Sequence, residues 1–321
     1  MMSDDEIRFD GRVALVTGGG RGIGRALSLL LASRGANVVV ADSGAALDGA
    51  GAEGGAARSV VSQIEAQGGT GLAFTGDLAT EQSCGAAIAS ALDAFGRIDA
   101  IAHNASTSPE LRPADQLSTR DLEGLMRINP MAALWLARHA WPHMVRQRYG
   151  RLVLASSAGI YGSFGNAHYA AAKAAIIGVV RCLALEGAAH GITVNGVAPS
   201  ARTRMTERLH DTAYSRWLLE TMAPEHVAAG SAFLLSEACA LNGETISLGG
   251  GRIARLRLAE SEGVMDVAAS PESVGEAMPA TMADERMFYP DDLSDRSARV
   301  ARLFCVSEKL DSSASIAVKP G

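Results

Sequence analysis

The chain has 321 residues, of which 48% are hydrophobic, and a formal net charge of −6 at pH 7. Because phosphate backbones demand clustered cations, this charge argues against nucleic acid as the general partner. No stretch reaches the roughly 18 uncharged apolar residues that cross a bilayer. The acidic start Met-Met-Ser-Asp-Asp-Glu lacks the positive region of a signal peptide, so we expect a cytoplasmic protein with no membrane span.

Cysteine and histidine spacing gives no sign of a metal site. Four cysteines lie tens of residues apart, which predicts reduced, buried thiols: Cys84, Cys182, Cys239 and Cys305. His139 and His143 share an i, i+4 spacing, but Trp141 and Pro142 between them favour packing. We therefore expect no metal.

Short apolar runs alternate with helical patterns from residue 13 to about residue 248. The first strand is expected over 13–17, the first helix over 23–34 and the second strand over 37–42. Later strands are expected over 71–75, 98–102, 151–155, 192–198 and 244–248, and helices near 81–95, 118–145 and 168–188. Strands separated by helices, without hairpin turns, are typical of a doubly wound parallel sheet. We therefore predict an α/β Rossmann fold flanked by helices on both faces.

Two stretches fall outside this alternation. From 43 to 57, glycine and alanine supply eleven of fifteen residues, and such a segment is too flexible to be helical throughout. Beyond residue 252 the regular pattern ends, and Pro271, Pro279 and Pro290 interrupt a mixed segment. We predict a domain over 7–255 and a C-terminal extension over 256–321 that packs on the core or at a subunit contact.

A glycine-rich turn joins the first predicted strand to the first helix. It reads Thr17-Gly-Gly-Gly-Arg-Gly-Ile-Gly24. Its glycines permit a tight turn, let backbone N–H groups approach a pyrophosphate, and place phosphate at the positive end of a helix. With an acid eighteen residues past Gly24, the pattern predicts a dinucleotide site with these contacts: Thr17, Gly18, Arg21, Gly22, Ile23 and Gly24.

The acid that ends the second strand, Asp42, indicates which dinucleotide binds. A carboxylate there accepts hydrogen bonds from the adenosine ribose, whereas a 2′-phosphate would face a like charge. We therefore expect NAD rather than NADP, with Arg21 facing solvent rather than binding a 2′-phosphate. The glycine-rich segment after Asp42 either covers the adenosine side or is a surface insertion. Further cofactor contacts are expected after the third and fourth strands: Asp77, Leu78, Asn104 and Ala105.

Four residues carry the groups of a proton-transfer site. A free tyrosine has a pKa of about 10, so its use as a base at neutral pH needs a shift of about three units, or about 4 kcal/mol. Lys173, one helical turn from Tyr169, is expected to lower that pKa and to hold the nicotinamide ribose. Ser156 is expected to bind the substrate oxygen, and Asn129 to hold a water that relays the proton.

Together, Thr-Gly-x-x-x-Gly-Ile-Gly, the asparagine, the serine and Tyr-x-x-x-Lys resemble the short-chain dehydrogenase/reductase family over about residues 7–255. The resemblance implies that Asn129, Ser156, Tyr169 and Lys173 form a catalytic tetrad, and that hydride moves between nicotinamide C4 and a carbinol or carbonyl carbon. It also implies a homodimer or homotetramer, with the helices near 118–145 and 168–188 as contacts. Implied cofactor contacts include Tyr169, Lys173, Pro199 and Thr203.

A narrower similarity extends to about residue 280. Several segments are similar to the (3R)-hydroxyacyl-CoA dehydrogenase domain of peroxisomal multifunctional enzyme type 2, among them Ile7-Arg-Phe-Asp-Gly-Arg-Val, Ser163-Phe-Gly-Asn and Arg204-Met-Thr. This implies oxidation of a (3R)-3-hydroxyacyl-CoA with NAD. The alternatives are a hydroxysteroid or other lipophilic secondary-alcohol dehydrogenase, a 3-oxoacyl-thioester reductase, and a catalytically silent NAD-binding scaffold or sensor. Three arginines near the expected substrate loop either meet CoA phosphates or are solvated: Arg202, Arg204 and Arg208.

The chain departs from the family pattern after the fourth strand. The usual Asn-Asn-Ala-Gly is His103-Asn-Ala-Ser106 here, so the local turn and its cofactor contact are expected to differ. The chain also shows no Ser-Lys-Leu terminus and no hydratase or sterol-carrier module, from which we expect a free-standing, bacterial enzyme.

Overall fold

The computed structural model describes residues 6–51, 54–208 and 210–304. The acidic N-terminal residues, Cys305 and the side chain of Arg208 lie outside this described part. The chain forms two compact units, one up to Arg255 and one from Leu256 onward. No helix in the described part is long and apolar enough to cross a bilayer.

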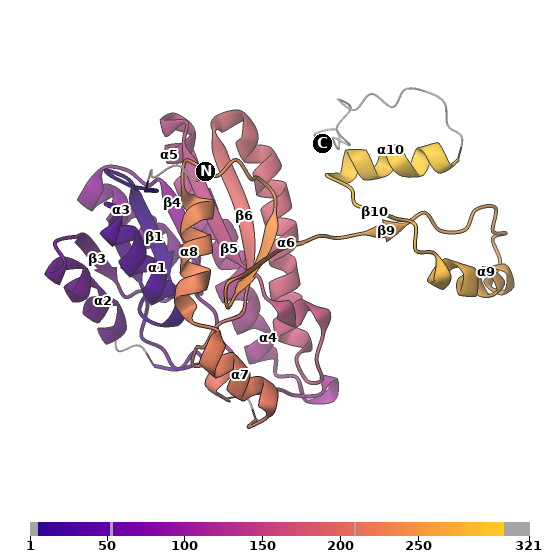
Figure 1. Cartoon of the computed structure of the whole chain (residues 1–321), viewed down its shortest axis with the longest axis horizontal. Coiled ribbons are helices and arrows are strands. Elements are labelled where there is room, and N and C mark those ends of the chain that lie inside the picture. The colour runs from indigo at the N-terminus through magenta and orange to yellow at the C-terminus, as the bar shows by residue number, and fades with distance from the viewer. Residues whose placement is uncertain (1–5, 52–53, 209, 305–321) are drawn as a thin grey trace. The chain divides into compact units, whose positions relative to one another are not determined.

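The first unit is built on one eight-stranded sheet, in the order β3-β2-β1-β4-β5-β6-β7-β8. All pairings from β3 through to β7 are parallel, which confirms the predicted doubly wound sheet (Figure 1). The strands are β1 Val13–Thr17, β2 Asn37–Ala41, β3 Thr70–Phe74, β4 Ala100–His103, β5 Gly150–Ala155, β6 Ile192–Pro199, β7 Thr245–Gly249 and β8 Arg252–Leu256.

The sheet has one hairpin that the sequence pattern did not predict. Only Gly250 and Gly251 join β7 to β8, and both have a positive φ, 54° and 81°. A connection of two residues joins antiparallel neighbours, and these glycines adopt the left-handed backbone it needs. The expectation of a sheet without hairpin turns is therefore wrong at this edge.

Helices cover both faces of the sheet, and side-chain alternation along β1 shows why. Ala14 and Val16 pack in one core cluster with α1, α2 and α8, whereas Val13 and Leu15 pack in a second cluster with α3, α5 and α6. A strand buried on both faces reads as a continuous apolar run, which β1 does. The helices are α1 Gly22–Ser33, α2 Gly55–Ala66, α3 Glu81–Phe95, α4 Thr119–Met126, α5 Ala132–Gln147, α6 Ala167–Gly187, α7 Ala213–Thr221 and α8 Pro224–Leu235.

The stretch predicted as one helix near 118–145 is interrupted. A π-helical turn, η2 (Arg127–Met131), separates α4 from α5 and contains Pro130. Proline has no N–H to donate, so the regular hydrogen-bond ladder cannot continue through this position. Short 3₁₀ turns occupy further connections: η1 Ala114–Gln116, η3 Ala158–Tyr161, η4 Ala188–His190 and η5 Thr206–Arg208.

The second unit has little interior of its own. It contains β9 (Glu260–Ser261) paired antiparallel with β10 (Met287–Phe288), and the helices α9 (Pro271–Ala283) and α10 (Leu293–Leu303). Between 256 and 304 every described residue is at least partly exposed. Salt bridges such as Arg296 to Glu260, at 2.6 Å, join its elements instead of a buried apolar core.

Three of the four cysteines lie in the described part, and all three are free thiols. Cys84 and Cys239 are buried, as predicted. The prediction of a buried thiol is wrong for Cys182, because this residue lies on the exposed face of α6.

Candidate functional site

The predicted site residues gather at the carboxyl ends of four neighbouring strands. Thr17 ends β1, Asn104 follows β4, Ser156 follows β5 and Pro199 ends β6. These strands are consecutive in the sheet, and the winding direction reverses between β1 and β4. Ligands of open α/β sheets bind outside the strand ends at such a reversal.

The glycine-rich turn is shaped for close approach of a ligand. A side chain at Gly24 would place its Cβ 2.1 Å from the Gly18 carbonyl oxygen, and one at Gly18 would lie 3.0 Å from Ala105 N. Gly22, with φ of 51°, opens α1 and faces the Thr203 methyl group. No side chain caps the N-terminus of α1, and its first turn carries no acid. Its N–H groups, including that of Ile23, therefore fit a pyrophosphate.

Asp42 lies at the end of β2 and is held by two backbone donors. Gly20 N donates to its Oδ2 at 3.0 Å, and Gly44 N donates to its Oδ1 at 2.8 Å. These bonds leave lone pairs on both oxygens, since a carboxylate has about four acceptor positions. Asp42 is thus fixed beside the glycine turn and keeps free acceptor positions.

Two arginines converge next to Asp42. Arg21 Nη1 and Arg204 Nη1 each lie 3.5 Å from the Ala45 carbonyl oxygen. Burial and the like charge of Arg21 lower the pKa of Arg204. Arg21 therefore contacts the loop that follows β2, whereas the sequence analysis favoured an Arg21 side chain that faces solvent. Arg202 instead donates to Leu219 O at 3.3 Å.

The glycine-rich segment after β2 reaches across to the loop after β4. Ser108 N donates to Leu47 O at 2.7 Å, and Gly54 N donates back to Ser43 O at 3.0 Å. Part of the predicted 43–57 segment, residues 52 and 53, lies outside the described residues. Near the third strand, Asp77 Oδ1 accepts from Ala79 N at 3.0 Å and Leu78 is buried.

A hydrogen-bond network occupies the ends of β1 and β4. Thr17 Oγ1 accepts from Asn104 N and Ala105 N, both at 3.1 Å, and lies 2.8 Å from His103 Nδ1. The amide nitrogen of the Asn104 side chain is buried and has no partner in the protein, so it is available to a ligand. Ser106 turns to its neighbour, donating to Thr107 O at 3.1 Å.

Tyr169 and Lys173 lie one turn apart on α6, with Lys173 Nζ 5.8 Å from the centre of the tyrosine ring. Lys173 Nζ donates to Ala155 O at 2.9 Å, and burial lowers the pKa of Lys173 to about 7. Burial raises the pKa of Tyr169, and a hydrogen bond with Ser157 partly opposes this. Burial is the larger of these two causes, so the pKa of Tyr169 lies above its ordinary value. The lowering of that pKa by Lys173 stays a prediction.

The two serines after β5 differ in their partners. Ser156 is buried, and its Oγ donates to Lys173 O at 2.8 Å. The hydroxyl of Ser157 accepts from Gly159 N at 3.0 Å and is the one that bonds Tyr169. Ser157 was not selected from the sequence, although the adjacent serine pair at a strand end was a visible signal.

Asn129 belongs to the π-helical turn. Its Nδ2 donates to Leu125 O at 2.8 Å. Its Oδ1 is buried and has no partner in the protein. Because a buried acceptor without a partner is costly, this oxygen is placed to bind a water or a ligand group.

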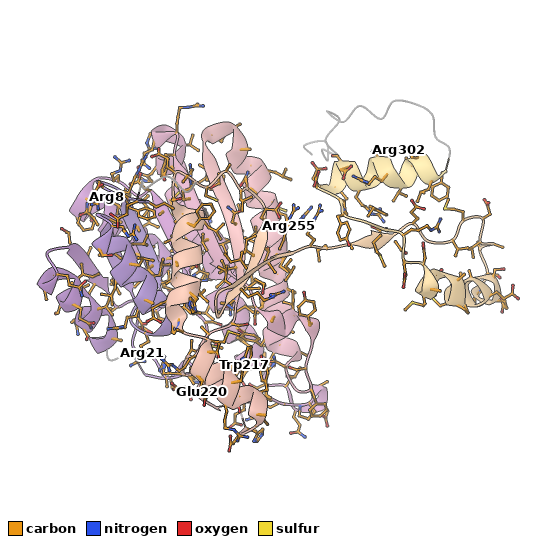
Figure 2. All side chains as sticks on the ribbon, in the orientation of Figure 1. Arg8, Arg21, Trp217, Glu220, Arg255 and Arg302 are labelled. Carbon is orange, nitrogen blue, oxygen red and sulfur yellow. The ribbon has the colours of Figure 1, made fainter. Side chains whose placement is uncertain are left out.

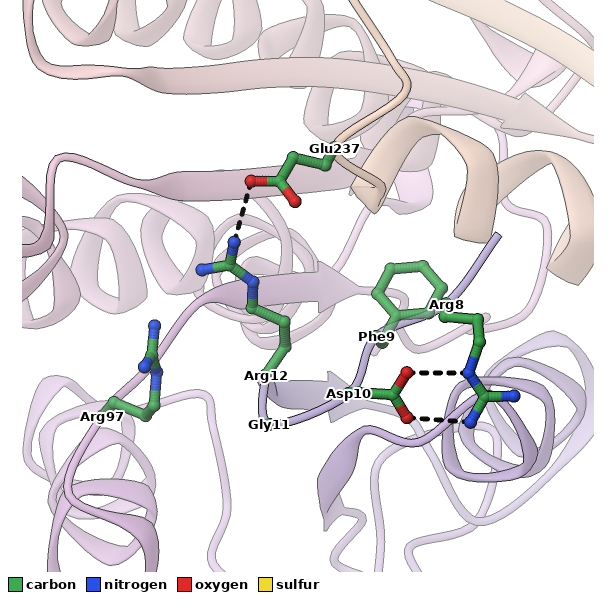
Figure 3. Close-up of a pocket in the computed structure, with 7 residues that line it drawn as sticks. All are labelled: Arg8, Phe9, Asp10, Gly11, Arg12, Arg97 and Glu237. Carbon is green, nitrogen blue, oxygen red and sulfur yellow. Dashed lines mark hydrogen bonds and ion pairs between the residues drawn. The ribbon is translucent and has the colours of Figure 1, made fainter. Parts of the chain in front are cut away.

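A separate polar cavity, of about 360 Å³, lies before β1 and β4, at the opposite strand ends (Figure 3). Its arginines are already paired: Arg8 with Asp10 at 2.7 Å, and Arg12 with Glu237 at 2.9 Å. This cavity does not contain the predicted site residues. Within the described residues, no group of three or more His, Cys, Asp or Glu side chains is arranged to hold a metal ion.

Residues 12–213 match the family described as short chain dehydrogenase. The match covers more than half of the chain, so this protein belongs to the short-chain dehydrogenase family. It is an oxidoreductase that acts on CH–OH groups.

Two curated relatives are similar over most of the chain. Peroxisomal multifunctional enzyme type 2 of Mus musculus is 41% identical over 252 residues, which is 78% of this chain and 33% of that protein. The chain thus spans a third of the mouse protein's length. A putative short-chain type dehydrogenase/reductase of Mycobacterium tuberculosis is 39% identical over 269 residues, covering 80% of this chain and 92% of that one.

Solved structures show the same fold. A short chain dehydrogenase from Mycobacterium avium superposes with a TM-score of 0.75 at 34% identity, covering 86% of this chain and 96% of that one. A 7α-hydroxysteroid dehydrogenase solved with NADH and 7-oxo glycochenodeoxycholic acid gives a TM-score of 0.70 at 26% identity, covering 78% of this chain and 98% of that one.

Proposed function

We propose that this protein is an NAD-dependent dehydrogenase of secondary alcohols whose substrate is a (3R)-3-hydroxyacyl-CoA. The observation that carries the proposal is the arrangement on α6: a half-buried phenol and a buried amine lie one turn apart, beside two strand-end hydroxyls. They lie at the same edge of the sheet as the glycine turn. The similarity to (3R)-hydroxyacyl-CoA dehydrogenase domains supports the substrate class.

In this proposal, Tyr169 takes the proton of the substrate hydroxyl. A bound nicotinamide would supply the hydride acceptor, and the carbinol carbon is oxidised to a carbonyl. Because burial raises the pKa of Tyr169, the phenol needs help to release its own proton. With a pKa of about 7, the Lys173 amine is neutral in about half of the molecules at neutral pH, and the neutral amine can accept that proton.

Ser156 and Asn129 complete the proton path. Ser156 must exchange its bond to Lys173 O before it can donate to the substrate oxygen. Asn129 Oδ1, buried and without a partner, holds the water through which the proton leaves. Ser157 keeps the phenol oriented through its hydrogen bond.

Asp42 supports NAD over NADP. Its carboxylate is fixed by Gly20 N and Gly44 N, and it would repel the up to two negative charges of a 2′-phosphate bound beside it. Arg21 and Arg204 lie close enough to offset part of that repulsion. We therefore expect a moderate preference for NAD over NADP.

Exposed apolar side chains around the site support a lipophilic substrate. Leu111, Tyr161 and Phe164 are 65%, 79% and 86% exposed, and their loops are joined by the bond from Arg112 N to Gly165 O at 2.9 Å. Figure 2 shows Arg21 and Trp217 at one edge of the first unit, and the Trp217 ring is also partly exposed. An acyl chain bound over this apolar surface would remove the surface from water and so stabilise the complex.

The test compares NADH formation from (3R)-3-hydroxyacyl-CoA thioesters of short and medium chain length with that from steroid alcohols. We expect the thioesters to turn over, and the medium chain to have the lower KM because it covers more apolar surface. Turnover of steroids alone would favour the hydroxysteroid alternative. If the protein only reduces 3-oxoacyl thioesters, it is the reductase of the third alternative. If it binds NAD without turnover of any of these compounds, it is the catalytically silent scaffold or sensor.

The C-terminal unit and the oligomeric state extend this proposal. No described hydrophobic side chain between 256 and 304 is buried, and Met282 and Phe304 are 79% and 65% exposed, so the unit needs an apolar partner surface. The core of the same chain and a neighbouring subunit are the two candidates. A homodimer or homotetramer and a cytoplasmic location stay predictions.

A further inference from the structure

His103 lies in the interior between the cofactor turn and the π-helical turn. It ends β4 and is 2% exposed. Its Nδ1 lies 2.8 Å from Thr17 Oγ1, at the end of β1, and its Nε2 lies 3.0 Å from the carbonyl oxygen of Ile128. Ile128 directly precedes Asn129, so one imidazole connects two parts of the proposed site.

The partners of His103 fix its protonation. A carbonyl oxygen can only accept, so Nε2 carries the proton and Nδ1 is the acceptor. Thr17 Oγ1–H therefore donates to Nδ1, while the same oxygen accepts from Asn104 N and Ala105 N. Every position of the threonine hydroxyl is then used, and the network is complete only with a neutral imidazole.

The π-helical turn needs such an anchor. Pro130 has no N–H, and the Leu125 carbonyl five residues earlier accepts instead from the side chain of Asn129. The orientation of the Asn129 amide therefore depends on where this irregular turn lies. Burial lowers the pKa of His103, and the nearby charge of Lys173 lowers it further. His103, Asn129 and Lys173 therefore share one buried region.

We propose that His103 is a positioning residue that fixes the π-helical turn to the end of β1 and so holds Asn129 Oδ1 in place for proton transfer. This inference rests on the proposed function through the role given to Asn129. It goes beyond that function because it assigns a role to a histidine at a position where asparagine is usual in the family. Protonation of His103 would break the arrangement, since a second N–H would meet a threonine oxygen whose acceptor positions are already used.

The experiment compares the full-length wild type with two variants. His103→Leu removes both hydrogen bonds at similar volume, and His103→Asn restores one donor and one acceptor. For His103→Leu we expect kcat to fall at least about tenfold while the Kd for NAD and the substrate KM stay within about threefold. For His103→Asn we expect kcat within about threefold of wild type.

Amide hydrogen exchange provides a readout that does not depend on turnover. Peptides covering 125–133 should exchange at least about tenfold faster in His103→Leu than in wild type, while peptides of α3 stay unchanged. Leu31→Ala, which removes a fully buried side chain at the far end of α1, is the matched control. It should lower thermal stability without changing kcat or exchange in 125–133.

Several outcomes would overturn the inference. One is unchanged exchange in 125–133; another is equal loss of NAD binding and kcat in His103→Leu. If that variant does not fold, His103→Phe keeps a planar ring of similar shape without either bond, and it should show the same losses. If wild type turns over no hydroxyacyl-CoA, the proposed function fails, but the exchange comparison still decides whether His103 holds the turn.

Discussion

The two ends of the proposed cofactor site are built differently. At the end assigned to chemistry, four side chains are nearly inaccessible to solvent: Ser156, Lys173, Asn129 and His103. Burial lowers the pKa values of two of them, Lys173 and His103. At the adenosine end, Asp42 lies at the start of a glycine-rich loop and is fixed by backbone donors. If the proposed function holds, the interior would control proton transfer, whereas a surface loop would control which nucleotide binds.

The largest effect is expected at the buried end. Tyr169→Phe removes the phenolic oxygen with little change in packing, so kcat should fall by about a thousandfold, since a general acid/base typically contributes 10² to 10⁴ in rate. NAD affinity, measured by fluorescence titration, should stay within about threefold. Tyr289→Phe changes an exposed tyrosine of the second unit in the same way and is the control. Full activity of Tyr169→Phe would remove Tyr169 from its assigned role.

A second effect concerns stability in acid. Burial is the main cause that lowers the pKa of His103 from 6.5 to about 4. The unfolded chain therefore takes up a proton between these pH values while the folded chain does not, so stability falls as pH falls. The loss should reach about 3 kcal/mol by pH 4. Denaturant unfolding at several pH values measures it.

The control for this pH dependence is His103→Asn, which has no titrating group at that position. Its stability should vary less between pH 6.5 and pH 4 than that of wild type. An identical pH dependence in both proteins would assign the acid sensitivity to other residues. The free energies of unfolding of wild type and His103→Asn at pH 7 should be compared first, because His103→Asn also changes packing.

The smallest effect is expected at the adenosine end. Asp42→Ala removes the negative charge that opposes a 2′-phosphate, so the ratio of kcat/KM for NAD to that for NADP should fall about tenfold, equivalent to about 1.4 kcal/mol. Asp48→Ala, in the same loop, serves as control, because among the described residues the Asp48 carboxylate accepts from Ala50 N and not from the glycine turn. An unchanged ratio in Asp42→Ala would leave cofactor choice to Arg21 and Arg204.

The fold and the family were predictable because their signals are local. The apolar run of β1, the glycine turn and the start of α1 follow one another directly, and the i, i+4 spacing of Tyr169 and Lys173 requires only a helix. The comparisons confirm the short-chain dehydrogenase family, and the parallel sheet confirms the fold class. The roles of the individual site residues stay predictions.

Contacts between distant segments were not predictable in the same way. The bond from His103 to Ile128 and the approach of Arg204 to Ala45 depend on which strands become neighbours. The shift in the pKa of Tyr169 depends on how completely the ring is buried, which spacing does not reveal. Pro130 was a local signal of the π-helical turn, yet the periodicity around it is that of a continuous helix.

The bond from Asn129 Nδ2 to Leu125 O restricts what can stand at position 129. Aspartate would keep an oxygen for the water but leave the Leu125 carbonyl without a donor, and leucine would lose both functions. A substitution there therefore disturbs backbone support and chemistry at once, and its kinetic effect cannot be attributed to either alone. A side-chain donor is needed at position 129 because Pro130 has no N–H to offer the Leu125 carbonyl. Residues 129 and 130 are therefore expected to vary together among related sequences.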